Sequence, residues 1–434
     1  MKSGYPVRMG LPNTCMLPEL FAVLAGTSTV PHPTLLQPPP LVQPLPPPTP
    51  EARGHLTQTL SEHLDSEHFC VTWETEDTTE DVAARTLEAL ELAWDAMVER
   101  DGWDAPLSSE NWLLSTMLDP SLDGTGFTGQ YTDNATAVVY PYIWINPLYE
   151  DMPEFFRSLA AHEFNHALQW RKRPYANGWE EPWYWEASAE WGAELALPEA
   201  NAYALQSYYY AEHPEYRYSS MQDYHQYGMF LVNAFLEEYR TGSGGMHQVW
   251  LLGEQHPEKT WDKLITEISG DTLDTFWPEL TTSIAHNTLE ESELYEQPVR
   301  AGILGDGEGG TLDFLGTHYW KVQTDTWIES FGRVVLGSPM GTGTQVQVSE
   351  GDWLTVTGLS NQPTDYTLWF TEPPDSGDFD TGGESPALGC GCSSVSPYQG
   401  FGWGGLLLAT LLQRRKRSKP TADGTDFSPT GLSC

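Results

Sequence analysis

The pattern of hydrophobic and polar positions divides the first part of the chain into strands and one helix. The apolar run 68–73 predicts a strand, and residues 80–100 repeat apolar side chains every three or four positions, as one face of a helix does. The β-prone run 137–145 predicts a further strand, and Pro141 within it predicts that this strand lies at a sheet edge. The Asp- and Gly-rich segment 119–133 is expected to be a loop.

The pattern then becomes helical and later alternates again. Helices are predicted at 153–172, 182–197, 220–240 and 258–268. Five short alternating segments separated by turn residues predict a small β-sandwich, and they span 319–322, 333–336, 345–348, 353–356 and 366–370. A mixed first part, a helical second part and an all-β third part place the chain in the α+β class.

The N-terminal end differs from this middle part. Residues 31–50 contain ten of the 33 prolines, which predicts a stiff spacer that builds no core. Before the spacer, the short apolar run 20–25 follows Lys2 and Arg8, which is the order of an export signal. A proline and a glutamate directly ahead of that run make the signal an imperfect one.

The C-terminal end contains an apolar stretch at 398–412 followed directly by four cations, which predicts a transmembrane or sorting segment at 398–417. The stretch is shorter than the about 20 residues that span a bilayer, and a buried C-terminal helix is the alternative. With the Cys-Gly-Cys string at 390–392, the order resembles the myxobacterial-type C-terminal sorting signal of exported, surface-anchored proteins. Such signals normally stop at the cations, whereas here residues 418–434 follow.

The charge composition argues against one class of binding partner. The chain has 61 acidic and 21 basic side chains, a formal net charge of −40. A surface this acidic repels phosphate backbones, which argues against a nucleic-acid-binding function. It suits an exported protein, or one that works at high salt. Of five cysteines only Cys70 lies in the middle of the chain, so no disulfide framework is expected there.

The predicted helix 153–172 carries the string His162-Glu163-Phe164-Asn165-His166. Histidines four positions apart lie on one helical face, so both imidazoles can reach a single zinc ion. Glu163 projects beside them, where a carboxylate can take the proton of a metal-bound water. The alternative is a pair of histidines exposed on a surface helix.

A hydrolytic zinc site needs a third protein ligand and leaves the fourth position to water. The predicted helix 182–197 offers Glu186, 20 positions after His166. Glu190 follows one turn later on the same face, where it can accept a hydrogen bond from a ligand histidine and fix its tautomer. The small residues at 187–189 allow the two helices to approach closely. Taken alone, the two glutamates also fit an ordinary acidic pair on a surface helix.

These two helices resemble those of the gluzincins, the thermolysin-like zinc metallopeptidases. The strings HEFNHALQW and WYWEASAEW resemble more closely a group of secreted bacterial metalloproteases in which HEFxHAxQ precedes WxxExxAxW. The resemblance covers about 65–240, and the β-rich part at 311–372 fits the group in outline. It implies a zincin-like catalytic domain, with a mixed sheet, an active-site helix and a mainly helical second lobe.

The same resemblance implies roles for individual residues. His162, His166 and Glu186 would bind Zn²⁺, Glu163 would be the general base, and Glu190 would support a ligand from the second shell. The strand within 137–145 would pair with the substrate backbone.

Peptide hydrolysis also requires a donor that stabilises the negative oxygen formed on the scissile carbonyl. The predicted helix 220–240 contains Tyr227 beside a glycine, which is the first candidate, with His225 and Tyr224 as alternates. The histidine segment of thermolysin is not recognisable in this chain. Aromatic packing within a helical domain explains each of the three residues equally well.

The sequence therefore predicts an exported zinc metalloendopeptidase that acts on proteins or peptides and is held at the cell surface by its C-terminal segment. Two alternatives stay open: a non-catalytic surface protein with a structural or vestigial zinc site, whose β-domain binds glycan or protein, and a zinc hydrolase of non-peptide substrates. The sequence predicts no oligomeric state.

The expected parts of the chain are a leader and spacer (1–50), an α/β lobe (51–150), a helical zinc-binding lobe (151–298), a β-sandwich (299–372), a linker (373–397), the transmembrane or sorting segment (398–417) and a tail (418–434).

Overall fold

The computed structural model describes residues 60–122, 124–133, 138–172, 182–299 and 301–373. The predictions for the leader, the Pro-rich spacer, the linker after residue 373, the transmembrane or sorting segment at 398–417 and the tail lie outside these ranges. Within them, no helix combines the length and the apolar character that a membrane span requires. The described part is a mixed α+β structure with three sheets.

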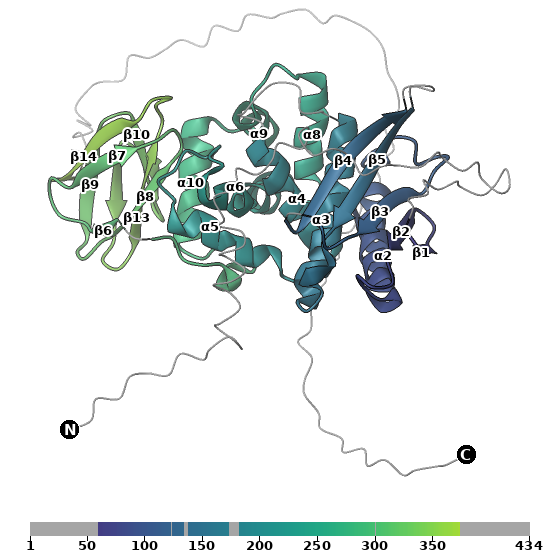
Figure 1. Cartoon of the computed structure of the whole chain (residues 1–434). Helices are drawn as coiled ribbons and strands as arrows, with labels where there is room; N and C mark the ends of the chain where they lie inside the picture. Colours follow the sequence, from purple (N-terminus) through teal and green to yellow (C-terminus); the bar gives the residue numbers. More distant parts are fainter. Residues whose placement is uncertain (1–59, 123, 134–137, 173–181, 300, 374–434) are drawn as a thin grey trace, which may run out of the picture. The chain divides into compact units, whose positions relative to one another are not determined.

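A mixed sheet with the strand order β1-β2-β3-β5-β4 forms the first part of the structure (Figure 1). Its strands are β1 (Glu62–Asp65), β2 (Phe69–Trp73), β3 (Leu114–Leu118), β4 (Gly126–Asp133) and β5 (Val138–Ile145). The three inner strands run parallel, and β1 and β4 pair antiparallel at the two edges. The strand predicted at 68–73 is confirmed as β2, and all five of its residues are buried.

The prediction that Pro141 marks an edge strand is wrong. β5 lies between β3 and β4. Its parallel ladder with β3 begins at Tyr142, so Pro141 precedes that ladder and is paired only with Gln130 of β4. The missing N–H of the proline therefore interrupts no bond to β3.

The loop expected at 119–133 is also only partly correct, because its second half forms β4, the edge strand. Two glycines hid this strand from the hydrophobic pattern, and close packing explains both. A Cβ at Gly129 would lie 2.6 Å from the Tyr142 hydroxyl oxygen, and one at Gly126 would collide with the Glu163 side chain. The backbone of β4 thus approaches its neighbours more closely than a side chain would allow.

Helices pack on this sheet and continue beyond it. The predicted helices 80–100, 153–172 and 182–197 are confirmed: α2 (Glu80–Trp94) with a π-helical continuation η2 (Asp95–Arg100), α3 (Pro153–Lys172) and α4 (Pro182–Ala196). α2 contacts β2, and α3 contacts β4 and β5 (Figure 1). The Thr79 side chain caps α2 by accepting from the Val82 N–H.

The helix predicted at 220–240 is broken into four pieces: η5 (Gln222–Tyr224), α6 (His225–Gly228), α7 (Leu231–Leu236) and the π-helical η6 (Glu237–Thr241). Asp223 and Tyr224 adopt positive φ angles of 49° and 61°, which a right-handed helix cannot accommodate. The helix predicted at 258–268 is α9 (Trp261–Ser269). The remaining helical elements are η3 (Pro147–Tyr149), η4 (Tyr203–Gln206), α5 (Ser207–Glu212), α8 (Gly245–Gln255), α10 (Leu273–Ala285) and η7 (Ser292–Leu294).

The predicted β-sandwich is present. One sheet has the order β11-β10-β13-β8-β6 and the other β12-β9-β14-β7, and their inward side chains share one apolar core. The five predicted strands are β8, β10, β12, β13 and β14, and the sequence pattern missed the other four. The strands are β6 (Gly302–Ile303), β7 (Gly309–Leu312), β8 (Thr317–Lys321), β9 (Thr326–Phe331), β10 (Val334–Ser338), β11 (Gly341–Gly343), β12 (Gln345–Val348), β13 (Trp353–Gly358) and β14 (Thr364–Thr371).

The sandwich contacts the helical part directly through hydrogen bonds and packing. The Tyr319 hydroxyl of β8 lies 2.7 Å from the Tyr210 hydroxyl of α5. The Thr317 N–H donates to the Pro214 carbonyl at 2.7 Å, and α10 packs against β10 and β13. These buried contacts join the sandwich and the helices into one folded unit.

The short helix α6 is held close to α5 at Gly228, and substitution of this glycine tests the contact. A Cβ at Gly228 would lie 2.5 Å from the Tyr210 backbone nitrogen. We expect Gly228→Ala to lower the free energy of unfolding by about 1–3 kcal/mol, measured by urea denaturation. Gly305→Ala is the control, because its Cβ would meet only the movable Glu308 side chain, at 3.4 Å. Equal stability of the two variants would contradict this packing.

Candidate metal centre

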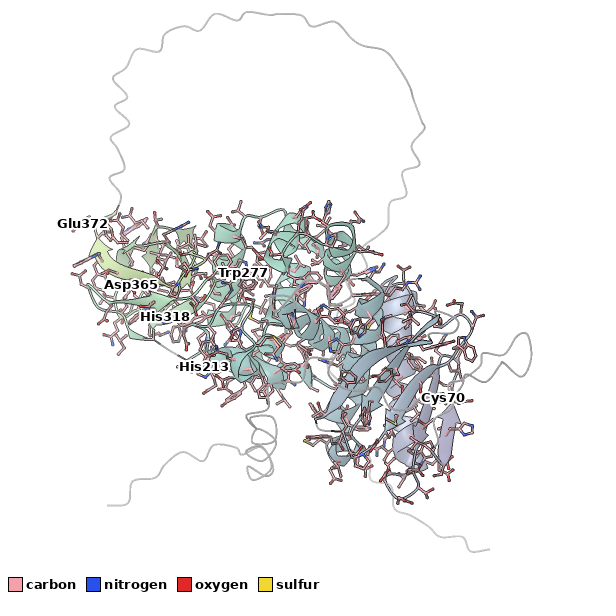
Figure 2. All side chains as sticks on the ribbon, turned by 45° about the horizontal axis from the view of Figure 1, so that its top comes forward. Cys70, His213, Trp277, His318, Asp365 and Glu372 are labelled. Atoms are coloured by element: carbon pink, nitrogen blue, oxygen red, sulfur yellow. The ribbon has the colours of Figure 1, made fainter. Side chains whose placement is uncertain are left out.

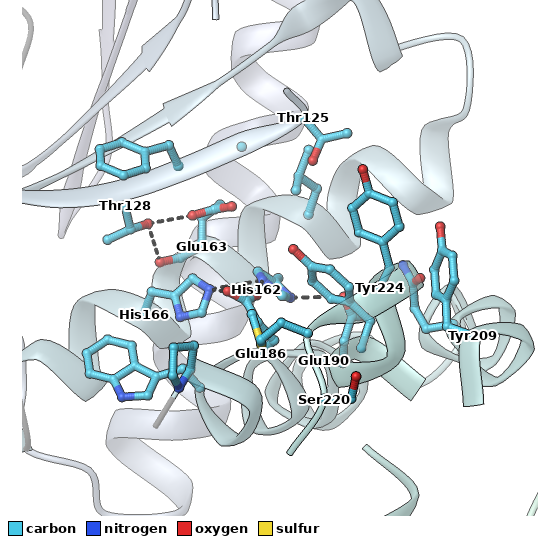
Figure 3. Close-up of a pocket in the computed structure, with 18 of the residues that line it drawn as sticks. Thr125, Thr128, His162, Glu163, His166, Glu186, Glu190, Tyr209, Ser220 and Tyr224 are labelled. Carbon is cyan, nitrogen blue, oxygen red and sulfur yellow. Dashed lines mark hydrogen bonds and ion pairs between the residues drawn. The ribbon is translucent and has the colours of Figure 1, made fainter. Parts of the chain in front are cut away.

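Helix α3 brings His162 and His166 together in the interior of the protein. Their Nε2 atoms are 3.0 Å apart, and the two side chains are only 6% and 8% exposed. The four-residue spacing places both rings on one helical face. Figure 3 shows them side by side, with Glu163 above them. The alternative of a histidine pair exposed on the surface is therefore excluded.

Helix α4 adds the third candidate ligand. Glu186 Oε2 lies 3.3 Å from His162 Nε2 and 3.4 Å from His166 Nε2. The three atoms form a nearly equilateral triangle. A tetrahedral zinc ion with bonds of 2.0–2.1 Å separates its ligand atoms by about 3.3 Å, so the triangle has the size that such an ion requires. Two imidazoles and one carboxylate are also a donor set that suits zinc.

A buried glutamine on α3 orients His166. Gln169 Oε1 lies 2.7 Å from His166 Nδ1. The amide nitrogen of Gln169 faces the Trp185 carbonyl oxygen at 3.0 Å, and because that oxygen can only accept, the amide orientation is fixed. Gln169 Oε1 must then accept from His166 Nδ1–H. The lone pair of His166 Nε2 is left facing the triangle.

Glu190 lies on the outer side of the other histidine. Its Oε1 is 3.1 Å from His162 Nδ1, an ion-pair contact that favours a proton on that nitrogen and directs Nε2 towards the triangle. Both Nε2 lone pairs and the Glu186 carboxylate then converge on one point. Three electron-rich atoms this close repel one another unless a cation lies between them. These residues therefore fit a metal ion.

The carboxylates of the cluster attract positive charge, and the pKa shifts of two residues show this. Burial alone would lower the pKa of His162, but the carboxylates of Glu190 and Glu186 outweigh burial and hold that pKa well above its usual value. Burial alone would raise the pKa of Glu186, but His166 and His162 hold it well below its usual value. The carboxylates thus stabilise positive charge on His162, and the histidines stabilise the negative charge on Glu186.

Glu163 points away from the triangle, towards the edge strand β4. The Thr128 hydroxyl lies 2.7 Å from Glu163 Oε2 and 2.8 Å from the Glu163 backbone oxygen (Figure 3). The carboxylate rests against the β4 backbone at Gly126, where no Cβ intervenes. Burial raises the pKa of Glu163 above its usual value. Helix α3 and strand β4 thus hold the Glu163 carboxylate beside the candidate metal ligands, but Glu163 is not itself one of these ligands.

The cluster opens into a cavity of about 770 Å³. Its walls come from β4, α3, α4, the segment 216–222 and, through Asp313, the β-sandwich. Tyr224 and Tyr227 line it, and the ring centres of Tyr227 and His162 are 6.1 Å apart. A cavity of this size, lined by the candidate metal ligands, can enclose several residues of an extended chain.

The structure places His225, an alternate candidate for the oxyanion donor, outside the cavity wall. Its side chain is fully buried, and it does not line the cavity. It packs between the rings of Tyr210 and Tyr216. The left-handed backbone at Tyr224 turns the chain just before α6, so His225 faces the core and Tyr227 the cavity.

The strand expected to pair with substrate also needs correction. The run 137–145 forms β5, which is enclosed by β3 and β4. The strand that borders the cavity is β4, whose residues and preceding threonine contribute 125–128 to its wall. As an edge strand, β4 has one side without a partner strand among the described residues.

Two residues of the site escaped the sequence analysis. Gln169 follows His166 by three positions, within the string HEFNHALQ, and this helical spacing is a signal that could have found it. Thr128 carries no such signal, because it lies in a segment whose strand was hidden by glycines.

Comparison with known proteins adds no assignment: no protein family matches the chain, and no curated protein matches its sequence.

Removal of a ligand or of its orienting partner tests the metal centre. We expect one zinc ion per wild-type chain after dialysis and none in Glu186→Ala, measured by plasma emission spectrometry. Gln169→Leu should weaken zinc binding about 10–100-fold, because His166 loses the acceptor that fixes its tautomer. Gln222→Leu, at an exposed position, is the control and should keep full affinity. Full zinc occupancy in Glu186→Ala would contradict this ligand set.

Proposed function

We propose that this protein is a zinc-dependent metalloendopeptidase that hydrolyses peptide bonds in proteins or peptides. The observation that carries the proposal is the convergence of His162 Nε2, His166 Nε2 and Glu186 Oε2, 3.0–3.4 Å apart, in the wall of a large cavity. A buried carboxylate that is not a ligand, Glu163, lies beside them. This is the minimum set for hydrolysis by an activated water.

Zinc bound by these three residues would polarise the scissile carbonyl and lower the pKa of a water to about 7. Glu163 is the general base: one of its carboxylate oxygens takes a proton from the attacking water and then delivers it to the nitrogen of the leaving amine. Its raised pKa favours this role, because a carboxylate in a buried site holds a proton more readily than one in water.

Thr128 positions the base. Its hydroxyl lies 2.7 Å from Glu163 Oε2 and 2.8 Å from the Glu163 backbone oxygen, so it can donate its one proton to the carboxylate. Thr128 is 4% exposed, and its place on β4 is fixed by pairing with Ile143 of β5. The carboxylate therefore has one defined orientation before substrate arrives, which reduces the cost of reaching the transition state.

Tyr227 is our first candidate for the oxyanion donor, with Tyr224 as the alternate. Both phenol rings line the cavity, and a neutral phenol can donate one hydrogen bond to a developing negative oxygen. The pKa of Tyr224 is raised by burial, which keeps its proton in place at neutral pH.

The edge strand β4 favours a peptide as the substrate over other molecules with hydrolysable bonds. An extended peptide can add to the side of β4 that borders the cavity, with main-chain hydrogen bonds that hold the scissile bond near Glu163. We further propose export, with the C-terminal segment as a membrane anchor or sorting signal. The order of charged and apolar segments at each end of the chain supports export, and so does the net charge of −40.

Glu163→Gln tests the enzymatic proposal directly. The amide keeps the size of the side chain but cannot take a proton, so we expect unchanged zinc content and a fall in casein hydrolysis of about 10²–10⁴-fold. Glu154→Gln is the control on the same helix, because Glu154 is exposed at its first turn. Its hydrolysis should match the wild type.

Other outcomes point to the two alternatives. Zinc in the wild type without hydrolysis of casein, esters or amides would favour a binding protein with a structural zinc site. Ester or amide hydrolysis that depends on Glu163, with no peptide cleaved, would favour a zinc hydrolase of non-peptide substrates.

Thr128→Val tests the positioning role. Valine has the same shape without the hydroxyl, so we expect kcat to fall about 10–100-fold, the worth of one hydrogen bond to a charged group, while KM and zinc content stay unchanged. Thr128→Ser should restore most of kcat, because it returns the hydroxyl. A merely structural threonine would give equal losses in both variants, and that result would contradict the role.

A further inference from the structure

The outward face of the smaller sheet of the sandwich carries three aromatic side chains, two of them exposed and one, Trp327, partly exposed. In the order β12-β9-β14-β7, alternate residues such as Ile328 and Leu368 point into the core. The residues between them point outwards, because side chains alternate along a strand. We call this surface the outer face; Asp365 on β14 marks its position in Figure 2.

Three aromatic residues occupy the two central strands of the outer face: Trp327 and Phe331 on β9, and Trp369 on β14. Phe331 is 55% and Trp369 is 45% exposed. Trp327 and Phe331 are four residues apart on one strand, about 13 Å. Trp369 pairs with Glu329, midway between them on the neighbouring strand. The three rings thus form a stripe along the middle of the sheet.

Hydrogen-bonding side chains flank this stripe. Gln345 and Gln347 lie on β12, opposite Glu329 and Trp327. Thr311 on β7 lies opposite Asp365 on the other side. The outward positions of these four strands include two carboxylates, amides and hydroxyls, and no lysine or arginine.

This composition selects among partners. An anionic polymer would be repelled by the carboxylates, and no cation of the outer face offsets them. An apolar protein surface would bury the Glu329 carboxylate and the Gln347 amide against groups that cannot hydrogen-bond with them, which opposes binding. A neutral polymer with apolar C–H faces and many hydroxyl groups satisfies both the rings and the polar side chains.

We propose that the outer face binds a neutral polysaccharide chain, with sugar rings stacked on Trp327, Trp369 and Phe331. Sugar hydroxyls would donate to Glu329 and exchange hydrogen bonds with Gln347, while Gln345 and Asp365 are already bonded to Thr371 and Thr311. The length of the stripe accommodates several successive sugars. This site uses no residue of the metal centre and does not depend on the proposed peptidase activity. Since the sandwich is bonded to the helical part, binding would hold the cavity near a polysaccharide-rich surface.

Depletion by insoluble polysaccharides tests the site. The full chain is mixed with microcrystalline cellulose, with chitin and with insoluble xylan, and the protein left in solution is measured. We expect at least one of these polymers to remove the wild type from solution. Trp369→Ala and Trp327→Ala should each weaken this binding at least tenfold and leave zinc content unchanged. Met340→Ala, which removes a 66% exposed side chain elsewhere on the sandwich, should bind as the wild type does.

Three outcomes would overturn the proposal. One is a folded wild type that none of the three polymers depletes. Another is depletion that the tryptophan variants share with the wild type while their unfolding temperatures are unchanged. The third is a concentration-dependent dimer that Trp369→Ala abolishes, since the outer face would then be a contact between two copies of the chain. Loss of peptidase activity in Glu163→Gln has no bearing on any of these results.

Discussion

The packing of α4 against α3 is the constraint on which the candidate metal centre depends. Gln169 is fully buried between the two helices and donates to the Trp185 carbonyl and to the Ser188 hydroxyl, both on α4. The same side chain accepts from His166. One glutamine therefore fixes the distance between the helices and the orientation of a candidate ligand, and the position of Glu186 follows from that distance. The small residues 187–189 make the close approach possible.

A second contact gives the site its chemistry. The edge strand β4 lies against α3 at Gly126 and donates to Glu163 through Thr128. The proposed base is thus held by a strand, and the candidate ligands are held by two helices. Because the strand and the helices both border the cavity, a peptide paired with β4 would meet the proposed base and the candidate ligands in the same cavity. The β-sandwich contributes Asp313 to the same cavity and, on its outer face, a surface of different chemistry.

The candidate metal ligands and most of the helices could be predicted from the sequence, for specific physical reasons. The four-residue spacing of His162 and His166 and the helical period around Glu186 are local patterns, and local patterns survive folding. β4 could not be found in the same way, because its glycines make room for Glu163 and Tyr142, which are distant in sequence. His225 lies in the core and not in the cavity wall, because the left-handed residues 223–224 break the helix that was expected to present it. Thr128 has meaning only once β4 and α3 are in contact.

Zinc K-edge X-ray absorption on the purified, zinc-loaded full chain tests the central claim most directly, because it reports the atoms around the metal whether or not a substrate is known. We predict four nitrogen or oxygen ligands at about 2.0–2.1 Å in the wild type, with multiple scattering from two imidazoles, and no retained zinc to measure in Glu186→Ala. A protein that retains no zinc, or a spectrum with sulfur neighbours or a single imidazole, would contradict the assignment of His162, His166 and Glu186 as ligands.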